Sequence, residues 1–193
     1  MPSLELFILD GVDQPGAMRT MIHCLNKMPD RFWQRASLSN EVTKDDLNPE
    51  KSWQRYCEFV LMDLVHHVTC DFVMIAHRDG YILNSPLWDH RFLDYDYIGA
   101  PWEDGTVGNG GFCIRSRRFM LWIAARAIER PLDRPEDQFI CHGLRATAEE
   151  AGFTFAPTEL AARFSTEGPP GSSPENSFGF HGHIGSHPLR KLL

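Results

Sequence analysis

The chain of 193 residues has a formal net charge of −7, with 42% hydrophobic and 23% charged residues. These values predict a soluble globular protein long enough to bury one sizeable core, and the acidic balance gives no sign of a basic surface for nucleic acid. The apolar runs are too short to cross a membrane and the N-terminus lacks a basic leader, so we expect a cytoplasmic protein without membrane insertion.

The beginning of the chain alternates between short strands and helices. Apolar patterns predict strand, helix, strand and helix in turn, over residues 4–9, 17–28, 35–39 and 52–68. A polar turn that contains Asp10 and Gly11 follows the first strand, and a nucleotide would meet the sheet there.

The most informative stretch follows the third predicted strand. Residues 71–76 (DFVMIA) form an apolar run that is typical of a strand covered on both faces, and His77, Arg78, Asp79 and Gly80 end it abruptly. In open α/β sheets the ligand lies outside the carboxyl ends of the strands, so Asp79 is placed for chemistry. An ordinary Asp-Gly turn is the alternative interpretation.

The remaining chain adds an aromatic segment over residues 81–102 and a loop that ends in Gly108-Asn109-Gly110-Gly111. Short strands over 112–114 and 153–155, helices over 115–128 and 135–151 and a flexible loop at about 168–177 are predicted after it. The alternation predicts an α/β fold, with a mixed, mostly parallel sheet flanked by helices in a single compact domain over residues 1–193.

The five cysteines predict neither a metal cluster nor a disulfide framework, because their number is odd and no CxxC spacing occurs. Most lie inside apolar segments, which is typical of buried thiols in a reducing compartment. They are Cys24, Cys57, Cys70, Cys113 and Cys141.

Seven motifs, taken in chain order, resemble one domain-of-unknown-function family that is similar to GT-A-fold glycosyltransferases. They are DGY (79–81), DYIGAPW (96–102), VGNGGF (107–112), RSR (115–117), ED (136–137), FSTE (164–167) and FGFHG (178–182). The resemblance spans roughly residues 4–183 and implies a GT-A-like (Rossmann-like) fold. It also implies a metal-dependent glycosyltransferase that moves a sugar from a nucleotide-sugar, with a UDP-sugar favoured, to a hydroxyl acceptor with inversion.

The resemblance implies a Mn²⁺ or Mg²⁺ site, because a divalent cation stabilises the charge that develops on a nucleoside diphosphate leaving group. Asp79 is the implied ligand, and His181 resembles the C-terminal histidine that completes such sites, with His183 as its competitor. The family usually has Gln-x-Asp-Gly, whereas His77 stands at the first position here. His77 is either an unusual ligand or a hydrogen-bond partner of phosphate or ribose, and loss of metal dependence is a third alternative.

Donor contacts are implied at the carboxyl ends of the first strands and along the glycine loop. The backbone of this loop would lie under the donor sugar, where any side chain would collide with the ring, and Asn109 would bind a sugar hydroxyl. Trp102 would stack on sugar or acceptor, or else belong to the core. The predicted donor-binding residues are Asp10, Gly11, Arg78, Trp102, Asn109, Gly110, Gly111 and Arg115.

Glu136 and Asp137 are the predicted catalytic acids, with Asp137 as the base. Direct displacement needs a carboxylate that takes the proton of the acceptor hydroxyl, and this pair stands at a predicted helix start. The alternative is that both residues only cap the helix. Glu167, in FSTE, has no role that the sequence identifies.

The acceptor is a glycan, a small molecule or a hydroxymethylated base in DNA, and the residues do not decide among them. Nucleic acid is expected as a partner only in the last case, as the acceptor. A homodimer would complete the acceptor side of so short a chain. Two other functions fit the residues: a non-catalytic binder of sugar nucleotides or glycans, which the unusual His77 favours, and a metal-dependent phosphohydrolase, which leaves the glycine loop unexplained.

Overall fold

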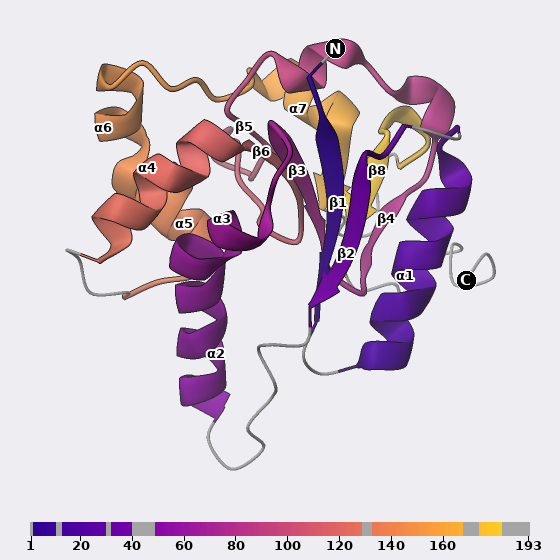
Figure 1. Ribbon diagram of the computed structural model, residues 1–193. Coiled ribbons are helices and arrows are strands. Elements are labelled where there is room, and N and C mark those ends of the chain that lie inside the picture. Colours follow the sequence, from indigo (N-terminus) through magenta and orange to yellow (C-terminus); the bar gives the residue numbers. More distant parts are fainter. Residues whose placement is uncertain are drawn as a thin grey trace.

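The computed structural model describes residues 2–10, 13–29, 32–39, 49–128, 133–167 and 174–182 (Figure 1). A five-stranded sheet has the order β2-β1-β3-β6-β5, and a three-stranded sheet has the order β4-β8-β7. The strands are β1 (Leu4–Leu9), β2 (Arg35–Ser39), β3 (Phe72–Ala76), β4 (Gly80–Ile82), β5 (Tyr97–Ile98), β6 (Phe112–Ser116), β7 (Ser165–Glu167) and β8 (Gly179–His181). The predicted mixed α/β fold is confirmed.

Helices cover both faces of the larger sheet. Figure 1 shows α1 on one side of the strands and α2 to α6 on the other. The helical segments are α1 (Gln14–Lys27), α2 (Pro49–Glu58), the π-helical η1 (Phe59–Asp63), α3 (Leu64–His67), α4 (Arg117–Ala127), α5 (Glu136–Gln138), the π-helical η4 (Phe139–Leu144), α6 (Arg145–Glu150) and α7 (Thr158–Phe164), with short 3₁₀ turns η2 (Ser85–Leu87), η3 (His90–Leu93) and η5 (Pro174–Asn176). None of the helices in the described ranges is long and apolar enough to cross a membrane.

The direction of β6 decides which segments meet at the functional edge of the sheet. Strands β2, β1 and β3 run parallel, so their carboxyl ends share one edge. Strand β6 is antiparallel to β3 and its first residue, Phe112, pairs with Ala76, the last residue of β3. The glycine loop before β6 therefore lies at the carboxyl end of β3, where the His77 N–H donates to the Gly111 carbonyl at 2.9 Å.

Aromatic packing joins the two sheets. Phe112 on β6 stacks against Phe164 at the end of α7, with ring centroids 5.3 Å apart, and both rings contact Phe178 next to β8. All three side chains are fully buried. Burial of this much aromatic surface is a large stabilising contribution, and it holds β8 beside the end of β3.

Several details of the structure differ from the prediction. The helix predicted over 115–128 begins at Arg117, because the Ser116 hydroxyl accepts from the Phe119 N–H and caps it, while residues 115–116 continue β6. The strand predicted over 153–155 is a single bridge between Phe155 and Tyr97. Helix α7 was not predicted, nor was the pairing of β7 with β8, and the sheet is less parallel than expected, since β6 and β5 pair antiparallel.

Asp89 offers a test of the pH dependence of stability. Its carboxylate caps η3 by accepting from the Arg91 N–H, binds the Arg91 guanidinium and lies 3.4 Å from Arg163 of α7. The hydrogen bonds from Arg91 lower the pKa of Asp89 to about 2. We expect Asp89→Ala to lower the free energy of unfolding by about 1 kcal/mol at pH 7.

The loss in Asp89→Ala should shrink as the pH falls. A carboxyl whose pKa is lower in the folded than in the unfolded chain stabilises fully above the unfolded value, near 4, and loses that contribution as the pH falls toward about 2. Urea unfolding of both proteins at pH 7 and at pH 3 measures the difference. A deficit that is the same at both values would contradict the assignment.

Candidate functional site

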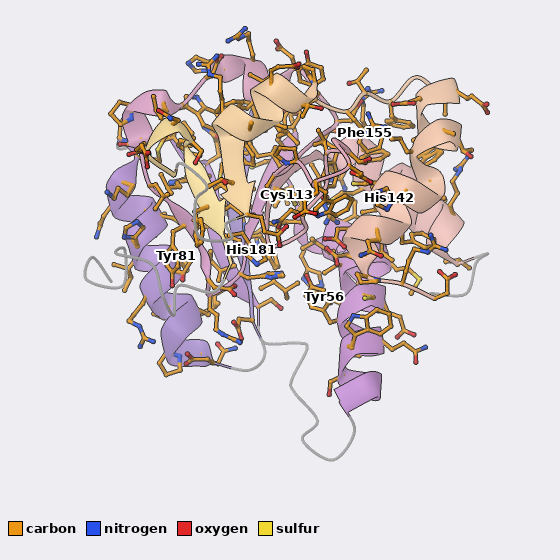
Figure 2. All side chains as sticks on the ribbon, turned by 180° about the vertical axis from the view of Figure 1, so that it is seen from behind. Tyr56, Tyr81, Cys113, His142, Phe155 and His181 are labelled. Atoms are coloured by element: carbon orange, nitrogen blue, oxygen red, sulfur yellow. The ribbon has the colours of Figure 1, made fainter. Side chains whose placement is uncertain are left out.

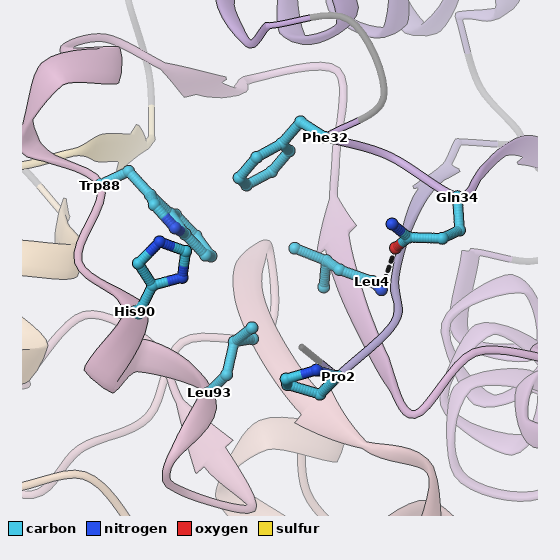
Figure 3. A pocket seen from close by; sticks show the side chains of 7 residues that line it. All are labelled: Pro2, Leu4, Phe32, Gln34, Trp88, His90 and Leu93. Carbon is cyan, nitrogen blue, oxygen red and sulfur yellow. Dashed lines mark hydrogen bonds between the residues drawn. The ribbon is translucent and has the colours of Figure 1, made fainter.

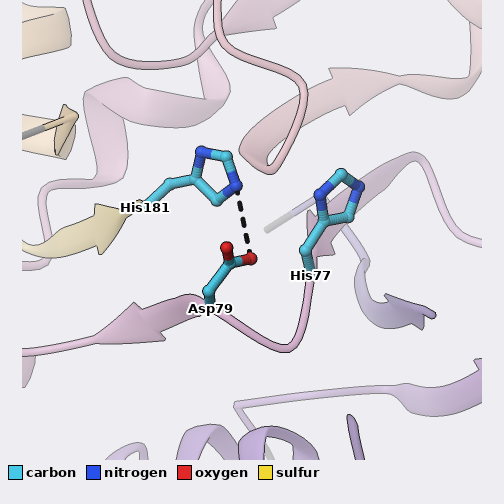
Figure 4. Close-up of side chains that lie close together, drawn as sticks. All are labelled: His77, Asp79 and His181. Carbon is cyan, nitrogen blue, oxygen red and sulfur yellow. Dashed lines mark ion pairs between the residues drawn. The ribbon is translucent and has the colours of Figure 1, made fainter. Parts of the chain in front are cut away.

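Three side chains converge at the carboxyl end of β3. His77 and Asp79 follow this strand, and His181 ends β8 (Figure 4). One ligand atom from each lies within 4.8 Å of the other two, and His181 Nε2 is 3.4 Å from Asp79 Oδ1. The register of the smaller sheet causes this, because His181 pairs with Gly80 and the Gly182 N–H donates to the Asp79 carbonyl.

The charges of the three groups differ. Burial opposes ionisation of Asp79, but the hydrogen bond and charge of His181 outweigh it and lower the pKa of this carboxyl to about 2. Burial, helped by the His181 charge, lowers the pKa of His77 to about 4. Burial also disfavours charged His181, yet Asp79 and Glu167 raise its pKa to about 9. A cation must displace a proton from His181 to bind its ring nitrogen. One ionised carboxylate and two imidazoles are then a donor set that fits a divalent transition metal such as Mn²⁺ better than the oxygen-seeking Mg²⁺.

The glycine loop separates this cluster from the predicted catalytic acids. A Cβ atom at Gly111 would stand 2.1 Å from His181 Nε2, and one at Gly110 would stand 1.8 Å from Glu136 Oε1. Such distances are far inside van der Waals contact, so the backbone approaches both side chains as only glycine permits. The glycines are thus required by neighbouring protein groups, a different reason from the predicted collision with a donor sugar.

Asn109 stands in the same loop with one polar group unused. Its φ is 65°, a left-handed conformation that asparagine tolerates better than most residues. The side chain is buried, and its Oδ1 accepts from the Gly111 N–H at 3.0 Å. Its Nδ2 has no hydrogen-bond partner among the described residues. A buried amide group without a partner costs free energy, which a ligand hydroxyl would recover.

Asp137 lies on the other side of the loop. Its Oδ2 accepts from the Gly110 N–H at 3.1 Å and its Oδ1 accepts from the Gln138 N–H at 2.7 Å. Because Gly110 binds Asp137 and the adjacent Gly111 touches His181, the carboxylate and the imidazole are separated by no more than about 12 Å. The side chain is half-buried, so the loop leaves it accessible.

Glu136 and Arg115 form a buried ion pair. Arg115 Nη2 lies 3.1 Å from Glu136 Oε1, and the guanidinium also packs over the Tyr97 ring. Glu136 is 4% exposed and Arg115 is 1% exposed. Burial, together with the charge of Asp137, raises the pKa of Glu136, while Arg115 opposes this. The predicted catalytic role of Glu136 and donor contact of Arg115 therefore find no support in this arrangement, which is that of a structural pair.

We expect Glu136→Ala to destabilise the fold by about 3 kcal/mol, because the variant leaves the Arg115 charge buried without its partner. Thermal or urea unfolding measures this loss. The double variant Glu136→Leu/Arg115→Met should be closer to wild type than Glu136→Ala, since it removes both charges. An additive loss in the double variant would show that the two side chains do not act as a pair.

The predicted donor residues at the first strand are also brought to this edge. Arg78 Nη1 binds both carboxylate oxygens of Asp10, at 3.0 and 3.2 Å, and the Arg78 side chain is 41% exposed. The Thr20 hydroxyl holds the Arg78 carbonyl at 2.8 Å. Gly11 and His183 lie outside the described residues.

Trp102 closes the far end of the glycine loop. Its ring lies against Gly108 and is 4.8 Å from the ring of His142. An open groove of about 530 Å³ adjoins this pair, lined by Asp104, Gly105, Thr106, Cys141, His142, Arg145, Ala146 and Glu149. Figure 2 shows His142 beside the helices and His181 at the end of β8.

A second, smaller cavity lies away from these residues. It has a volume of about 100 Å³ and is lined by Pro2, Leu4, Phe32, Gln34, Trp88, His90 and Leu93 (Figure 3). Leu4 begins β1, so this cavity is at the amino end of that strand, opposite the edge that carries Asp79. It is not part of the candidate site.

The comparisons with known proteins give a family and a fold. The family described as "Protein of unknown function (DUF5672)" matches residues 42–181. A glycosyltransferase involved in the glycosylation of the major capsid of PBCV-1 shares a TM-score of 0.59 at 10% identity, over 93% of this chain and 92% of that one.

Two other solved structures are less similar. The galactosyltransferase LgtC with donor and acceptor sugar analogs has a TM-score of 0.45 at 10% identity, over 92% of this chain and 86% of its own. A197 from STIV has 0.43 at 15%, over 72% and 76%. No curated protein matches the chain. At such identities the similarity to the capsid glycosyltransferase shows a shared GT-A-type fold and not a shared activity.

Proposed function

This chain belongs to the DUF5672 family of proteins of unknown function, and we propose that it is a metal-dependent glycosyltransferase. One observation carries the proposal: a carboxylate and two imidazoles converge at one face of a glycine loop, and the carboxylate of Asp137 binds its other face. The two groups are close enough to act on opposite sides of one sugar ring. The GT-A-type fold supports the proposal, since it places this edge where α/β sheets bind ligands.

A divalent cation held by His77, Asp79 and His181 would bind the diphosphate of a nucleotide-sugar and stabilise the charge on the leaving group. Around it, Arg78 has guanidinium N–H groups left for a phosphate oxygen or the ribose, because only its Nη1 binds Asp10. Asn109 Nδ2 would donate to a hydroxyl of the donor sugar and so orient the ring. We propose a UDP-sugar as donor and Mn²⁺ as the cation.

The transfer itself needs one proton acceptor. The acceptor hydroxyl attacks the anomeric carbon, its oxygen forms the new bond as the bond to the diphosphate breaks, and its proton passes to Asp137. Attack from the side opposite the leaving group inverts the anomeric configuration. The groove lined by His142 would admit a hydroxyl acceptor of the size of a sugar, and the Trp102 ring lies behind His142 at 4.8 Å between centroids.

The test is isothermal titration with nucleoside diphosphates and their sugars, UDP-sugars included, with and without Mn²⁺. Manganese-dependent binding of one nucleotide-sugar is the expected result. If the protein binds none of these ligands, the proposal is overturned. Hydrolysis of the diphosphate that no hydroxyl acceptor accelerates, with a nucleoside monophosphate and a sugar phosphate as products, would favour the phosphohydrolase. Binding without any turnover would favour a non-catalytic binder.

A further inference from the structure

The two histidines of the cluster are each contacted from outside by a second polar side chain. Tyr56 Oη on α2 lies 2.7 Å from His77 Nε2, and the two rings meet edge to face with centroids 5.5 Å apart. Glu167 Oε1 on β7 lies 3.7 Å from His181 Nδ1. Neither Tyr56 nor Glu167 belongs to the three convergent groups.

We propose that Tyr56 and Glu167 are positioning residues, which fix the ring nitrogen that each histidine presents to the centre of the cluster. The proposal deepens the proposed function, on which it rests for the cation. It also gives the FSTE motif, which contains Glu167, a role.

The contact with Tyr56 decides the orientation of His77. Figure 4 shows one ring nitrogen of His77 turned toward His181 and Asp79 and the other turned away. Since Tyr56 binds Nε2, the nitrogen that faces the cluster is Nδ1. A neutral imidazole carries one proton, on either of its two ring nitrogens. When that proton is on Nε2, it is donated to the Tyr56 oxygen, and the Nδ1 lone pair is free for a cation.

Glu167 does the same for His181 with the two nitrogens exchanged. The parallel pairing of β7 with β8 sets Glu167 opposite His181. His181 Nε2 faces Asp79, and Nδ1 faces Glu167 at a distance slightly too long for a hydrogen bond. Nδ1 accordingly has no hydrogen-bond partner among the described residues. The half-exposed Glu167 side chain needs to move by less than about 1 Å to accept the Nδ1 proton.

The two histidines therefore present different ring nitrogens to the centre of the cluster. These are Nδ1 of His77 and Nε2 of His181. Outer contacts of this kind, a carboxylate or oxygen acceptor behind a ligating imidazole, fix the tautomer and the ring plane. Cation binding then costs little conformational entropy, because both rings are already oriented toward the centre of the cluster. His77 would thereby serve as a metal ligand through Nδ1.

The first arm of the test is Mn²⁺ affinity, measured by titration followed by electron paramagnetic resonance. We expect Tyr56→Phe and Glu167→Gln each to weaken Mn²⁺ binding about tenfold while the unfolding transition stays close to wild type. Tyr81→Phe is the matched control, because its hydroxyl donates to the Arg78 carbonyl and to neither histidine. Its affinity should equal that of wild type. Unchanged affinity in both test variants would overturn the proposal.

The second arm reads the ring nitrogens directly by ¹⁵N nuclear magnetic resonance. In metal-free protein, the His77 Nε2 resonance should shift in Tyr56→Phe and stay in Tyr81→Phe. With Cd²⁺ bound, coupling should appear at His77 Nδ1 and His181 Nε2. Coupling at His77 Nε2 would overturn the proposal. A wild-type protein that binds neither cation but shows the metal-free shift would refute the proposed function and leave the Tyr56 contact in place.

Discussion

Asp79→Asn is expected to reduce Mn²⁺-dependent binding of the nucleotide-sugar by about 1,000-fold, which corresponds to about 4 kcal/mol. Asp79 is the ionised member of the cluster, and its carboxylate is the only formal negative charge among the three convergent groups. The amide keeps the shape of the side chain but cancels that charge, and a divalent cation loses several kcal/mol with it. Calorimetric titration of donor with and without Mn²⁺ measures the loss.

A matched control separates this effect from the loss of an ordinary ion pair. Asp104 lies 3.4 Å from His142 Nε2, the same distance that joins Asp79 to His181, but it stands on the surface outside the cluster. Asp104→Asn therefore makes the same chemical change beside a histidine. It should bind donor and Mn²⁺ as wild type does. If Asp79→Asn binds as tightly as Asp104→Asn, the metal site is elsewhere.

The sequence predicts the sheet edge well because its strands are simple. Residues 4–9 and 71–76 are short apolar runs, which are typical of strands that are covered on both faces of a sheet. The weaker strand over 35–39 has the same bounds in the structure as in the prediction. Since the carboxyl ends of parallel strands share an edge, the residues that follow them, Asp10 and Asp79, could be placed together without coordinates.

Long-range pairing is the part that local pattern does not reveal. Strands β7 and β8 have three residues each, too few for a period to show, and their register depends on the aromatic packing of Phe112, Phe164 and Phe178. In the sequence analysis, only the family resemblance assigned His181 to the metal site. Its approach to Asp79 follows from the pairing of β4 with β8.

Arg115 and Tyr56 show how a correct local pattern can hide a residue's role. The resemblance implied that Arg115 of the RSR motif contacts the donor, but β6 extends through Ser116 and Arg115 binds Glu136, a contact across 21 positions. Tyr56 lies in the helix predicted over residues 52–68 and packs against the core. Helical periodicity places a ring on a face, but it does not show that the hydroxyl meets His77.

Asp137→Asn should lower the rate of sugar transfer at saturating donor by about 1,000-fold, within the range that loss of general base catalysis produces. The amide can still accept from one backbone N–H of the two that bind Asp137, so the loop at Gly110 should keep its conformation. Mn²⁺-dependent donor binding should stay within about twofold of wild type, because Asp137 lies outside the cluster of His77, Asp79 and His181. Single-turnover kinetics and donor titration measure the two effects separately.

Asp133→Asn is the control for this variant. It removes an exposed carboxylate three residues before the same helix, and among the described residues this carboxylate pairs only with the neighbouring Arg134. It should transfer sugar at the wild-type rate. A loss of donor binding that equals the loss of rate in Asp137→Asn would mean that this residue holds the loop and does not take the proton. Retention of the anomeric configuration in the wild-type product, read from its proton coupling constants, would also contradict a single displacement with Asp137 as base, since one attack from the side opposite the leaving group must invert that centre.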